Sequence, residues 1–131
     1  MNLFVDASAL VAILAREPEA GNFVDEIGEA SASYSAIAQW ETTNALCRID
    51  PEFTLEQARH AILDFAALYE MELVAIGAEE AKIAAEAFAT YGKGRHPAKL
   101  NMGDCFAYAC AKANNARLLY KGDDFSHTDL A

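Results

Sequence analysis

Five acidic residues stand out because the segments around them are otherwise small and apolar: Asp6, Glu41, Asp104, Asp123 and Asp124. If folding gathered these carboxylates in one crevice, mutual repulsion and lost hydration would raise their pKa values. A bound divalent cation removes that penalty. Oxygen ligands with no His or Cys among them suit Mg²⁺ or Mn²⁺ and disfavour zinc or copper. The residue types therefore predict a site for a hard metal ion.

Each acid also has a simpler explanation. Asp104 heads a helical stretch, where an acid interacts favourably with the helix dipole. Glu41 taken alone is typical of a solvated helix position, and Asp123 and Asp124 are typical turn residues. Asp6 is harder to explain in this way, because aspartate is depleted in strands and this one ends a strand between apolar neighbours.

The chain alternates between strand and helix patterns. Short β-prone runs predict strands at 3–6, 31–35, 71–76 and 117–121, and two glycines with a proline predict a loop at 92–103. Helical spacing and end signals predict helices at 7–17, 17–27, 36–49, 54–69, 78–91 and 104–115. Ser35 is the expected N-cap of the third helix, and a capping box from Thr54 to Gln57 opens the fourth.

Strands joined by crossovers long enough to hold helices predict an α/β fold, a three-layer α/β/α domain with a central parallel sheet of four to five strands. A length of 131 residues suits one such domain over residues 1–131. Sheets of this kind bind ligands beyond the carboxyl ends of their strands. Asp6, Asp123 and Asp124 follow strands, so we expect them at one rim, with Asp104 on the helix that leads into the last strand.

The location of the protein is suggested by what its N-terminus lacks. The apolar stretch there has no basic region before it and is interrupted by Asp6, so it does not resemble a secretory signal. No apolar run reaches membrane-spanning length, and we expect a cytoplasmic protein. The three cysteines have neither CxxC nor Cys/His zinc spacing and are expected to be reduced core residues.

Four segments together resemble the PIN-domain ribonucleases of the VapC type, the toxins of bacterial toxin–antitoxin pairs: VDASALVAIL, WETTNAL, GKGRHPAKLNMGDCFAYACAK and LLYKGDDF. The resemblance covers essentially the whole chain, and NMGDCFAYA together with KGDDF is its most specific part. It implies a PIN-like α/β/α domain acting as a metal-dependent endoribonuclease, with Mg²⁺ or Mn²⁺ as cofactor and RNA phosphodiester bonds as substrate.

The resemblance also implies roles for individual acids. Asp6 and Asp104 correspond to the principal metal-binding aspartates, and Glu41 to the acid that binds metal or orients water. Asp123 corresponds to the fourth acid, favoured over Asp124 because it comes first after the strand. The number of metal ions, one or two, is not decided by counting four acids.

Two further residues are candidate supports for this site. Ser8 matches a hydroxyl position found beside the site in similar proteins, and Asn44 shares a helix face with Glu41. A metal held by carboxylates lowers the pKa of a water molecule and offsets charge developing at the phosphate. The chemistry therefore needs no Ser, His or Cys nucleophile.

The formal net charge of −10 argues against a nucleic-acid partner, because affinity for phosphates comes from Lys and Arg. A local basic patch answers this objection, since charges act within a Debye length, about 8 Å at physiological salt. Lys121 could pair with Asp124 or orient the carboxylates at the rim, and His96 is expected to be a loop residue rather than a metal ligand. The candidate contacts to RNA phosphates are Lys93, Arg95, Lys99 and Lys121.

Partners are also implied by the resemblance. Similar toxins bind a cognate antitoxin, frequently cut transfer RNA, often form homodimers and meet DNA only through the antitoxin. An antitoxin segment carrying arginine would complement the acids of this chain. The surface expected to receive it is apolar and comprises Leu10, Ile13, Ile37, Trp40 and Leu46.

Two other classes of protein are alternatives. A receiver-like or phosphatase-like phosphoryl-transfer protein also clusters acids at strand ends, but it needs an acceptor aspartate after a central strand, and the third strand ends without one at Ile76. A non-catalytic interaction module would use its acids only for solubility. Such a module would show no saturable Mn²⁺ site that depends on Asp104.

Overall fold

The computed structural model describes residues 1–131 and has a sheet of four parallel strands at its centre. The strand order is β3-β2-β1-β4, so β1 is an inner strand paired with both β2 and β4. The predicted parallel sheet is confirmed, with four strands. Their bounds are β1 (Asn2–Val5), β2 (Ser31–Ser35), β3 (Glu72–Val74) and β4 (Arg117–Leu119).

Six α-helices and one short 3₁₀ helix connect and follow the strands. Their bounds are α1 (Ala7–Leu14), α2 (Ala20–Gly28), α3 (Ala36–Ile49), α4 (Leu55–Leu68), α5 (Ala78–Tyr91), α6 (Met102–Ala113) and η1 (Asp124–His127). The Ser35 cap of α3 and the capping box of α4 are confirmed, because both hydrogen-bond patterns are present. Local sequence signals thus set these helix starts.

Several predicted boundaries are wrong by one to three residues: β3 and β4 stop at Val74 and Leu119, short of the predicted ends, and α2 begins at Ala20. Two further errors lie at candidate site residues. Asp6 is not the end of β1 but the N-cap of α1, so the strand ends at Val5. Helix α6 begins at Met102, two residues earlier than predicted, because Asn101 caps it. The predicted helix over 7–17 also ends early, at Leu14, and Arg16 beyond it has a positive φ of 58°.

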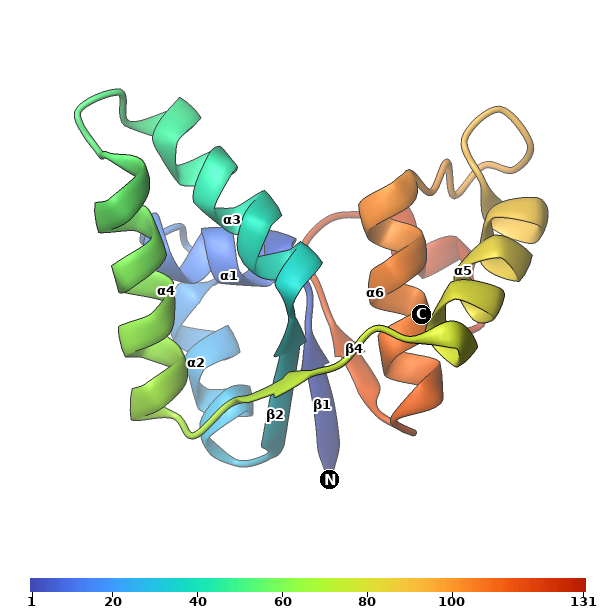
Figure 1. The fold of residues 1–131 in the computed structure, drawn as a ribbon, viewed down its shortest axis with the longest axis horizontal. Helices are drawn as coiled ribbons and strands as arrows, with labels where there is room; N and C mark the ends of the chain where they lie inside the picture. Colours follow the sequence, from blue (N-terminus) through green and yellow to red (C-terminus); the bar gives the residue numbers. More distant parts are fainter.

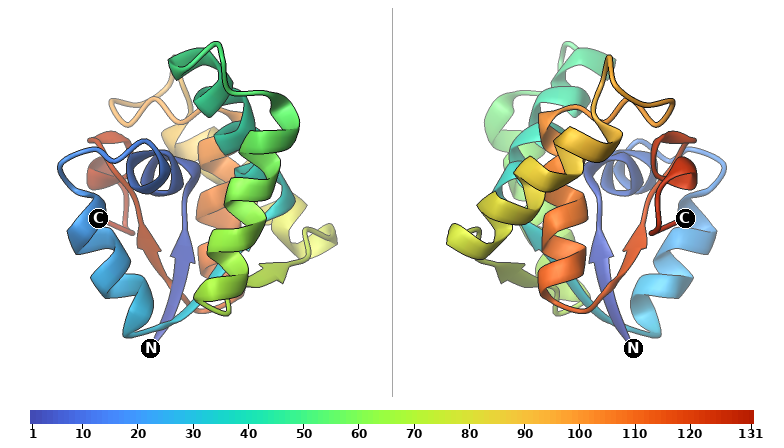
Figure 2. Two further views of the ribbon diagram at one scale, coloured as in Figure 1. Left: turned by 90° about the vertical axis from the view of Figure 1, so that its left-hand side faces the viewer. Right: turned by 90° about the vertical axis from the view of Figure 1, so that its right-hand side faces the viewer.

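The sheet separates two hydrophobic cores. Phe4 packs on the side of α5 and α6, whereas Leu3 and Val5 pack on the side of α1, α2 and α4. Successive residues of a strand point to opposite faces, which is why one short strand serves both cores. The side views show α4 in the foreground from one side and α5 with α6 from the other (Figure 2). The three-layer α/β/α arrangement is confirmed.

Burial corrects the predicted antitoxin surface. Leu10, Ile13 and Leu46 are buried in the protein and cannot be part of an exposed surface. Trp40, in contrast, is 66% exposed. Helical spacing alone could not separate these residues, because it identifies an apolar face without showing what covers it.

The structure also describes the cysteines, which were expected in the core, and the helices, which were expected to be too short or too polar to span a membrane. All three cysteines are free; Cys105 and Cys110 are buried and Cys47 is half-buried. None of the helices combines the length and the apolar character that crossing a membrane would require.

Candidate active site: an acidic pocket at the carboxyl end of the sheet

Strands β1 and β2 point toward the region between α3 and α6, where the chain passes from β1 into α1 (Figure 1). A cavity of about 460 Å³ lies there, and we call it the acidic pocket. It brings together three of the predicted acids from three different helix segments. Its lining residues include Asp6 and Ser8 at the start of α1, Glu41, Ala45 and Arg48 on α3, Asp104 on α6, and Lys121 and Gly122 after β4.

Asp6 is held by the helix it caps. Its Oδ2 accepts hydrogen bonds from the backbone N–H of Ser8 at 3.0 Å and from Ser8 Oγ at 2.6 Å. Ser8 Oγ in turn accepts the backbone N–H of Lys121 at 2.9 Å. Both bonds to Asp6 use Oδ2, so Oδ1 is the oxygen available to a ligand. The predicted supporting position of Ser8 is therefore a direct contact with Asp6.

Asp104 is held in a similar way. It occupies the third position of a capping box, in which its Oδ2 accepts the backbone N–H of Asn101 at 3.1 Å. Asn101 Oδ1 accepts the Asp104 N–H at 2.9 Å in return. The simpler explanation of Asp104 as a helix-start acid is thus correct. It does not compete with a role in the pocket, because the second carboxylate oxygen remains uncommitted.

Glu41 reaches the pocket from α3 without a cap of its own. Ala45 and Arg48 follow it at helical spacing and line the same cavity, while Ala38, Thr42 and Leu46 on the other side of α3 are buried. The Glu41 carboxylate lies against Gly103, the residue that precedes Asp104. Helix α3 thus carries one acid to the start of α6.

The three carboxylates influence one another electrostatically. Burial and the charges of Asp6 and Asp104 raise the pKa of Glu41 to about 7. Burial and the charges of Asp6 and Asp124 raise the pKa of Asp104 to about 6. Burial also raises the pKa of Asp6, against the opposing effect of its hydrogen bonds to Ser8. The pocket therefore holds more negative charge than its surroundings offset.

The segment after β4 places its two aspartates differently. The charge of Asp124 raises the pKa values of both Asp6 and Asp104. Asp123 precedes η1, and its backbone carbonyl accepts a hydrogen bond from Ser126 Oγ. Asp124, whose charge acts on both Asp6 and Asp104, is therefore the stronger candidate for the fourth acid, the reverse of the preference drawn from sequence order.

Two other candidate residues have different partners from those expected. Lys121 Nζ pairs with Glu17 at 3.0 Å and Glu19 at 3.1 Å, and not with Asp124, so its charge is partly offset and it is a poorer phosphate contact than predicted. Asn44 donates from Nδ2 to the backbone carbonyl of Trp40 at 2.8 Å and does not line the pocket. Its side chain stabilises its own helix instead.

The remaining predicted phosphate contacts lie on the loop between α5 and α6, which leads to the start of α6 (Figure 1). Lys93, Arg95 and Lys99 are exposed. His96 Nδ1 accepts the backbone N–H of Ala98 at 3.0 Å, as suits a loop residue.

Arg48 also lines the acidic pocket, and the sequence analysis did not identify it. The available signal was its spacing of seven residues from Glu41 on the same helix.

The donor set of the acidic pocket suits a hard divalent cation. Asp6 and Asp104 each have an uncommitted carboxylate oxygen, and Glu41 adds a third carboxylate. As the side chains stand, no three acidic, histidine or cysteine side chains lie close enough together to hold one ion. Burial and their mutual repulsion raise their pKa values, and a cation between them would favour the charged forms.

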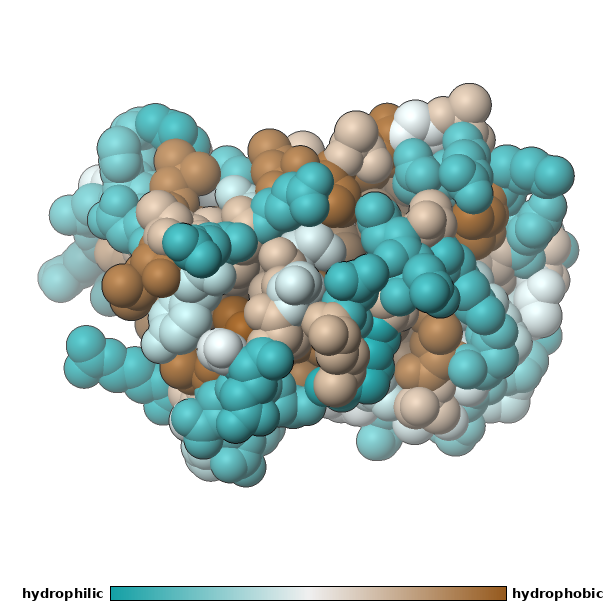
Figure 3. Space-filling view, turned by 90° about the horizontal axis from the view of Figure 1, so that it is seen from below, coloured by the Kyte–Doolittle hydropathy of each residue, from teal (hydrophilic) through white to brown (hydrophobic).

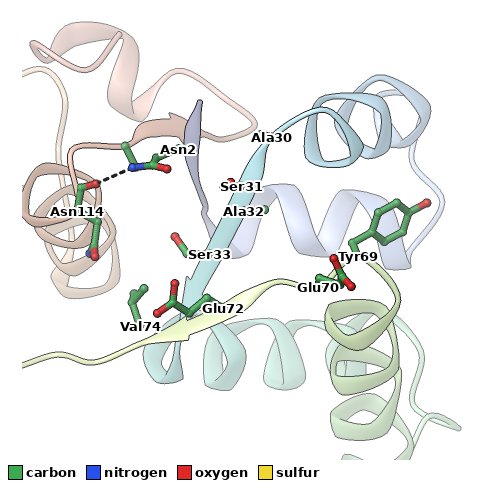
Figure 4. Close-up of a pocket in the computed structure, with 11 residues that line it drawn as sticks. Asn2, Ala30, Ser31, Ala32, Ser33, Tyr69, Glu70, Glu72, Val74 and Asn114 are labelled. Carbon is green, nitrogen blue, oxygen red and sulfur yellow. Dashed lines mark hydrogen bonds between the residues drawn. The ribbon is translucent and has the colours of Figure 1, made fainter.

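A second hollow lies near the start of β1 and β2, and Figure 4 shows the residues that line it. It contains Glu70 and Glu72 with Asn2, Ser31 and Ser33, and Asn2 Nδ2 donates to the Asn114 carbonyl at 3.4 Å. The face seen from below is a mixture of hydrophilic and hydrophobic residues (Figure 3). Parallel sheets bind ligands at the opposite ends of their strands, so the acidic pocket is the stronger candidate.

The fold is that of a PIN domain, and the PIN domain family model matches residues 3–130. Ribonuclease VapC30 of Mycobacterium tuberculosis is 40% identical over 129 residues, which cover 98% of this chain and 96% of that protein. A VapC ribonuclease of Rhizobium meliloti is 37% identical over 139 residues, covering 97% and 98%. The chain therefore belongs to the VapC ribonucleases of the PIN-domain family.

Solved structures agree on the fold. VapC20 of Mycobacterium tuberculosis, described as a toxin that cleaves the sarcin-ricin loop, superposes with a TM-score of 0.71 at 16% identity over 95% of this chain and 92% of that one. A toxin–antitoxin complex from Klebsiella pneumoniae gives a TM-score of 0.70 at 17% identity, over 99% and 94%. The family resemblance drawn from the sequence motifs is confirmed.

Proposed function

We propose that this chain is a metal-dependent endoribonuclease that hydrolyses RNA phosphodiester bonds, with Asp6, Glu41, Asp104 and Asp124 as its acidic core. The observation that carries the proposal is the convergence of three carboxylates in one pocket, where burial and mutual charge raise their pKa values. Membership among the VapC ribonucleases supports it.

The residues of the chain supply placement more than covalent chemistry. Asp6 and Asp104 are fixed by helix-capping hydrogen bonds, so they need little reorganisation to hold a cation. A bound Mg²⁺ or Mn²⁺ supplies Lewis acidity toward the phosphate and lowers the pKa of water. Arg48, on the rim of the same pocket, is positioned to bind a neighbouring RNA phosphate.

Asp104→Asn tests this proposal cleanly. An asparagine keeps an oxygen that can accept the Asn101 N–H, so the cap of α6 is retained while the charge is removed. We expect RNA cleavage by the wild type in Mn²⁺ and none in excess EDTA, and a loss of at least a hundredfold in Asp104→Asn. Asp64→Asn, at an exposed position of α4, is the matched control. Cleavage that persists in EDTA would overturn the proposal.

The second part of the proposal is neutralisation by an antitoxin. Trp40 and Met102 are 66% and 59% exposed, and with Ala36 and Ile37 they line an apolar hollow. Trp40 precedes Glu41 on α3, and Met102 lies two residues before Asp104 on α6, so an antitoxin bound there would lie on the same two helices that carry acids of the pocket. The similarity to a chain of a toxin–antitoxin complex supports an antitoxin as the partner.

The test is co-expression with a cognate antitoxin, to be sought in the reading frame next to the gene for this chain. Trp40→Glu should weaken that complex at least tenfold, whereas Leu68→Glu, at a 74% exposed leucine on α4, should not. Equal effects of the two substitutions would contradict the assigned surface. Loss of inhibition of RNA cleavage in Trp40→Glu provides the functional readout.

Two finer expectations belong to the same proposal. We expect a homodimer, which analytical ultracentrifugation of the purified chain would detect. We also expect transfer RNA among the substrates. Sequencing of RNA ends after expression of the wild type, compared with Asp6→Asn, would identify the cleaved RNA.

A further inference from the structure

Gly103 occupies the first turn of α6, in a position where glycine needs an explanation. Apart from proline, glycine is the residue least favourable to a helix. The backbone conformation at position 103 does not require a glycine, because the glycines with a positive φ are Gly94 and Gly122 and not Gly103. Gly103 is buried, so the reason for it lies in its neighbours.

The neighbour is Glu41. A Cβ added at Gly103 would lie 2.5 Å from Glu41 Cδ, 2.7 Å from its Oε1 and closer still to its Oε2. Its three nearest atoms all belong to this one carboxylate. The volume that a side chain would occupy at position 103 is therefore filled by the carboxylate that α3 delivers.

We infer that Gly103 is a positioning residue for Glu41. Because it lacks a side chain, the Glu41 carboxylate lies directly on the first turn of α6, next to Asp104. An alanine there would displace the flexible end of Glu41 rather than backbone, so the fold would survive while the carboxylate moved away from the pocket. The inference rests on the proposed function in assigning Glu41 to the acidic core.

The chain offers a matched control. Gly21 lies within α2, and a Cβ added there meets no atom within 4 Å. Gly21→Ala therefore tests the general effect of replacing a helical glycine, and Gly103→Ala adds the specific encounter with Glu41. Both substitutions should leave the metal-free melting temperature unchanged or raise it by roughly 2–4 °C.

The first measurement is Mn²⁺ affinity by calorimetry on the full chain. We expect Gly103→Ala to weaken Mn²⁺ binding about tenfold, the size of effect seen when a group that orients a metal ligand is lost. Gly21→Ala should bind as the wild type does. Unchanged affinity in Gly103→Ala would overturn the inference.

A double-mutant cycle separates positioning from other roles. In a Glu41→Ala background, Gly103→Ala should have no further effect on Mn²⁺ affinity and should raise the metal-free melting temperature by more than it does in the wild type. Equal losses of affinity in both backgrounds would show that Gly103 acts through another group, and would overturn the inference.

Failure of the proposed function gives a different result. If the wild type bound no Mn²⁺, the acidic core would be wrong, while the melting temperatures of the same four proteins would still report whether position 103 and Glu41 are coupled. If the changes in melting temperature caused by Gly103→Ala and Glu41→Ala simply added in the double variant, that result alone would refute the positioning role.

Discussion

Ser8 Oγ donates a hydrogen bond of 2.6 Å to Asp6 Oδ2, and the same Oγ accepts the backbone N–H of Lys121 at 2.9 Å. One hydroxyl thus ties the start of α1 to the segment that follows β4. Both segments lie at the acidic pocket, so Ser8 fixes Asp6 relative to the far side of the candidate site.

Removing this hydroxyl should loosen Asp6. In Ser8→Ala, we expect about tenfold weaker Mn²⁺ binding, because Asp6 loses a partner that orients it. We also expect lower stability, because the hydrogen bonds of Ser8 Oγ with Asp6 and Lys121 are lost. Calorimetry and thermal melting check the two effects. Ser8→Thr keeps a hydroxyl and should stay close to the wild type, and a Ser8→Ala protein that binds Mn²⁺ normally would contradict the predicted role.

The metal-free protein should become less stable as the pH rises toward 7. The pKa of Glu41 is raised from 4.5 to about 7, so between these values the folded state binds more protons than the unfolded state. The free energy of unfolding then falls with rising pH. Discounted for its partial exposure, Glu41 contributes roughly 1–2 kcal/mol to this loss.

Melting temperatures of the wild type and Glu41→Gln between pH 4.5 and 8 in EDTA isolate this effect. The difference between the two proteins should grow through the window from about 4.5 to 7 and then level off. Stabilisation by Mn²⁺ should increase over the same range, because binding requires the carboxylate. A pH-independent difference would show that Glu41 is not buried among like charges.

The fourth acid can be identified by a paired substitution. Asp124→Asn removes the charge that raises the pKa values of Asp6 and Asp104, so we expect it to weaken Mn²⁺ binding and slow RNA cleavage about tenfold or more. Asp123→Asn leaves the backbone carbonyl that bonds Ser126 and should have a small effect. The reverse order of effects would restore Asp123 to the site.

Arg48 should act on RNA binding rather than on the reaction itself. In Arg48→Ala, we expect KM for RNA to rise about tenfold with kcat little changed, since a charge-assisted contact to phosphate is lost. The slope of log KM against log salt concentration should fall by about 0.7, as expected when one phosphate contact on single-stranded RNA is lost. Arg59→Ala, which breaks only a pair with Glu56 on α4, is the control.

The secondary structure was largely predictable because it depends on neighbours along the chain. Ser35 and the Thr54 capping box start their helices as expected, and β2 spans the predicted residues. The errors at Asp6 and Asn101 have the same local origin, since a polar side chain that caps a helix was assigned to the preceding strand or loop. Alternation of strands and helices also sufficed to predict the parallel sheet.

By itself, the sequence determined the α/β class, the family and the set of acids from which a site could be made, because residue types, spacing and motifs are properties of the chain. Only the tertiary structure decided which acids meet. It brings Asp124 rather than Asp123 into electrostatic contact with Asp6, pairs Lys121 with Glu17, and lays Glu41 against Gly103. These relationships join residues on different elements, and their distances depend on how those elements pack, which no local pattern encodes.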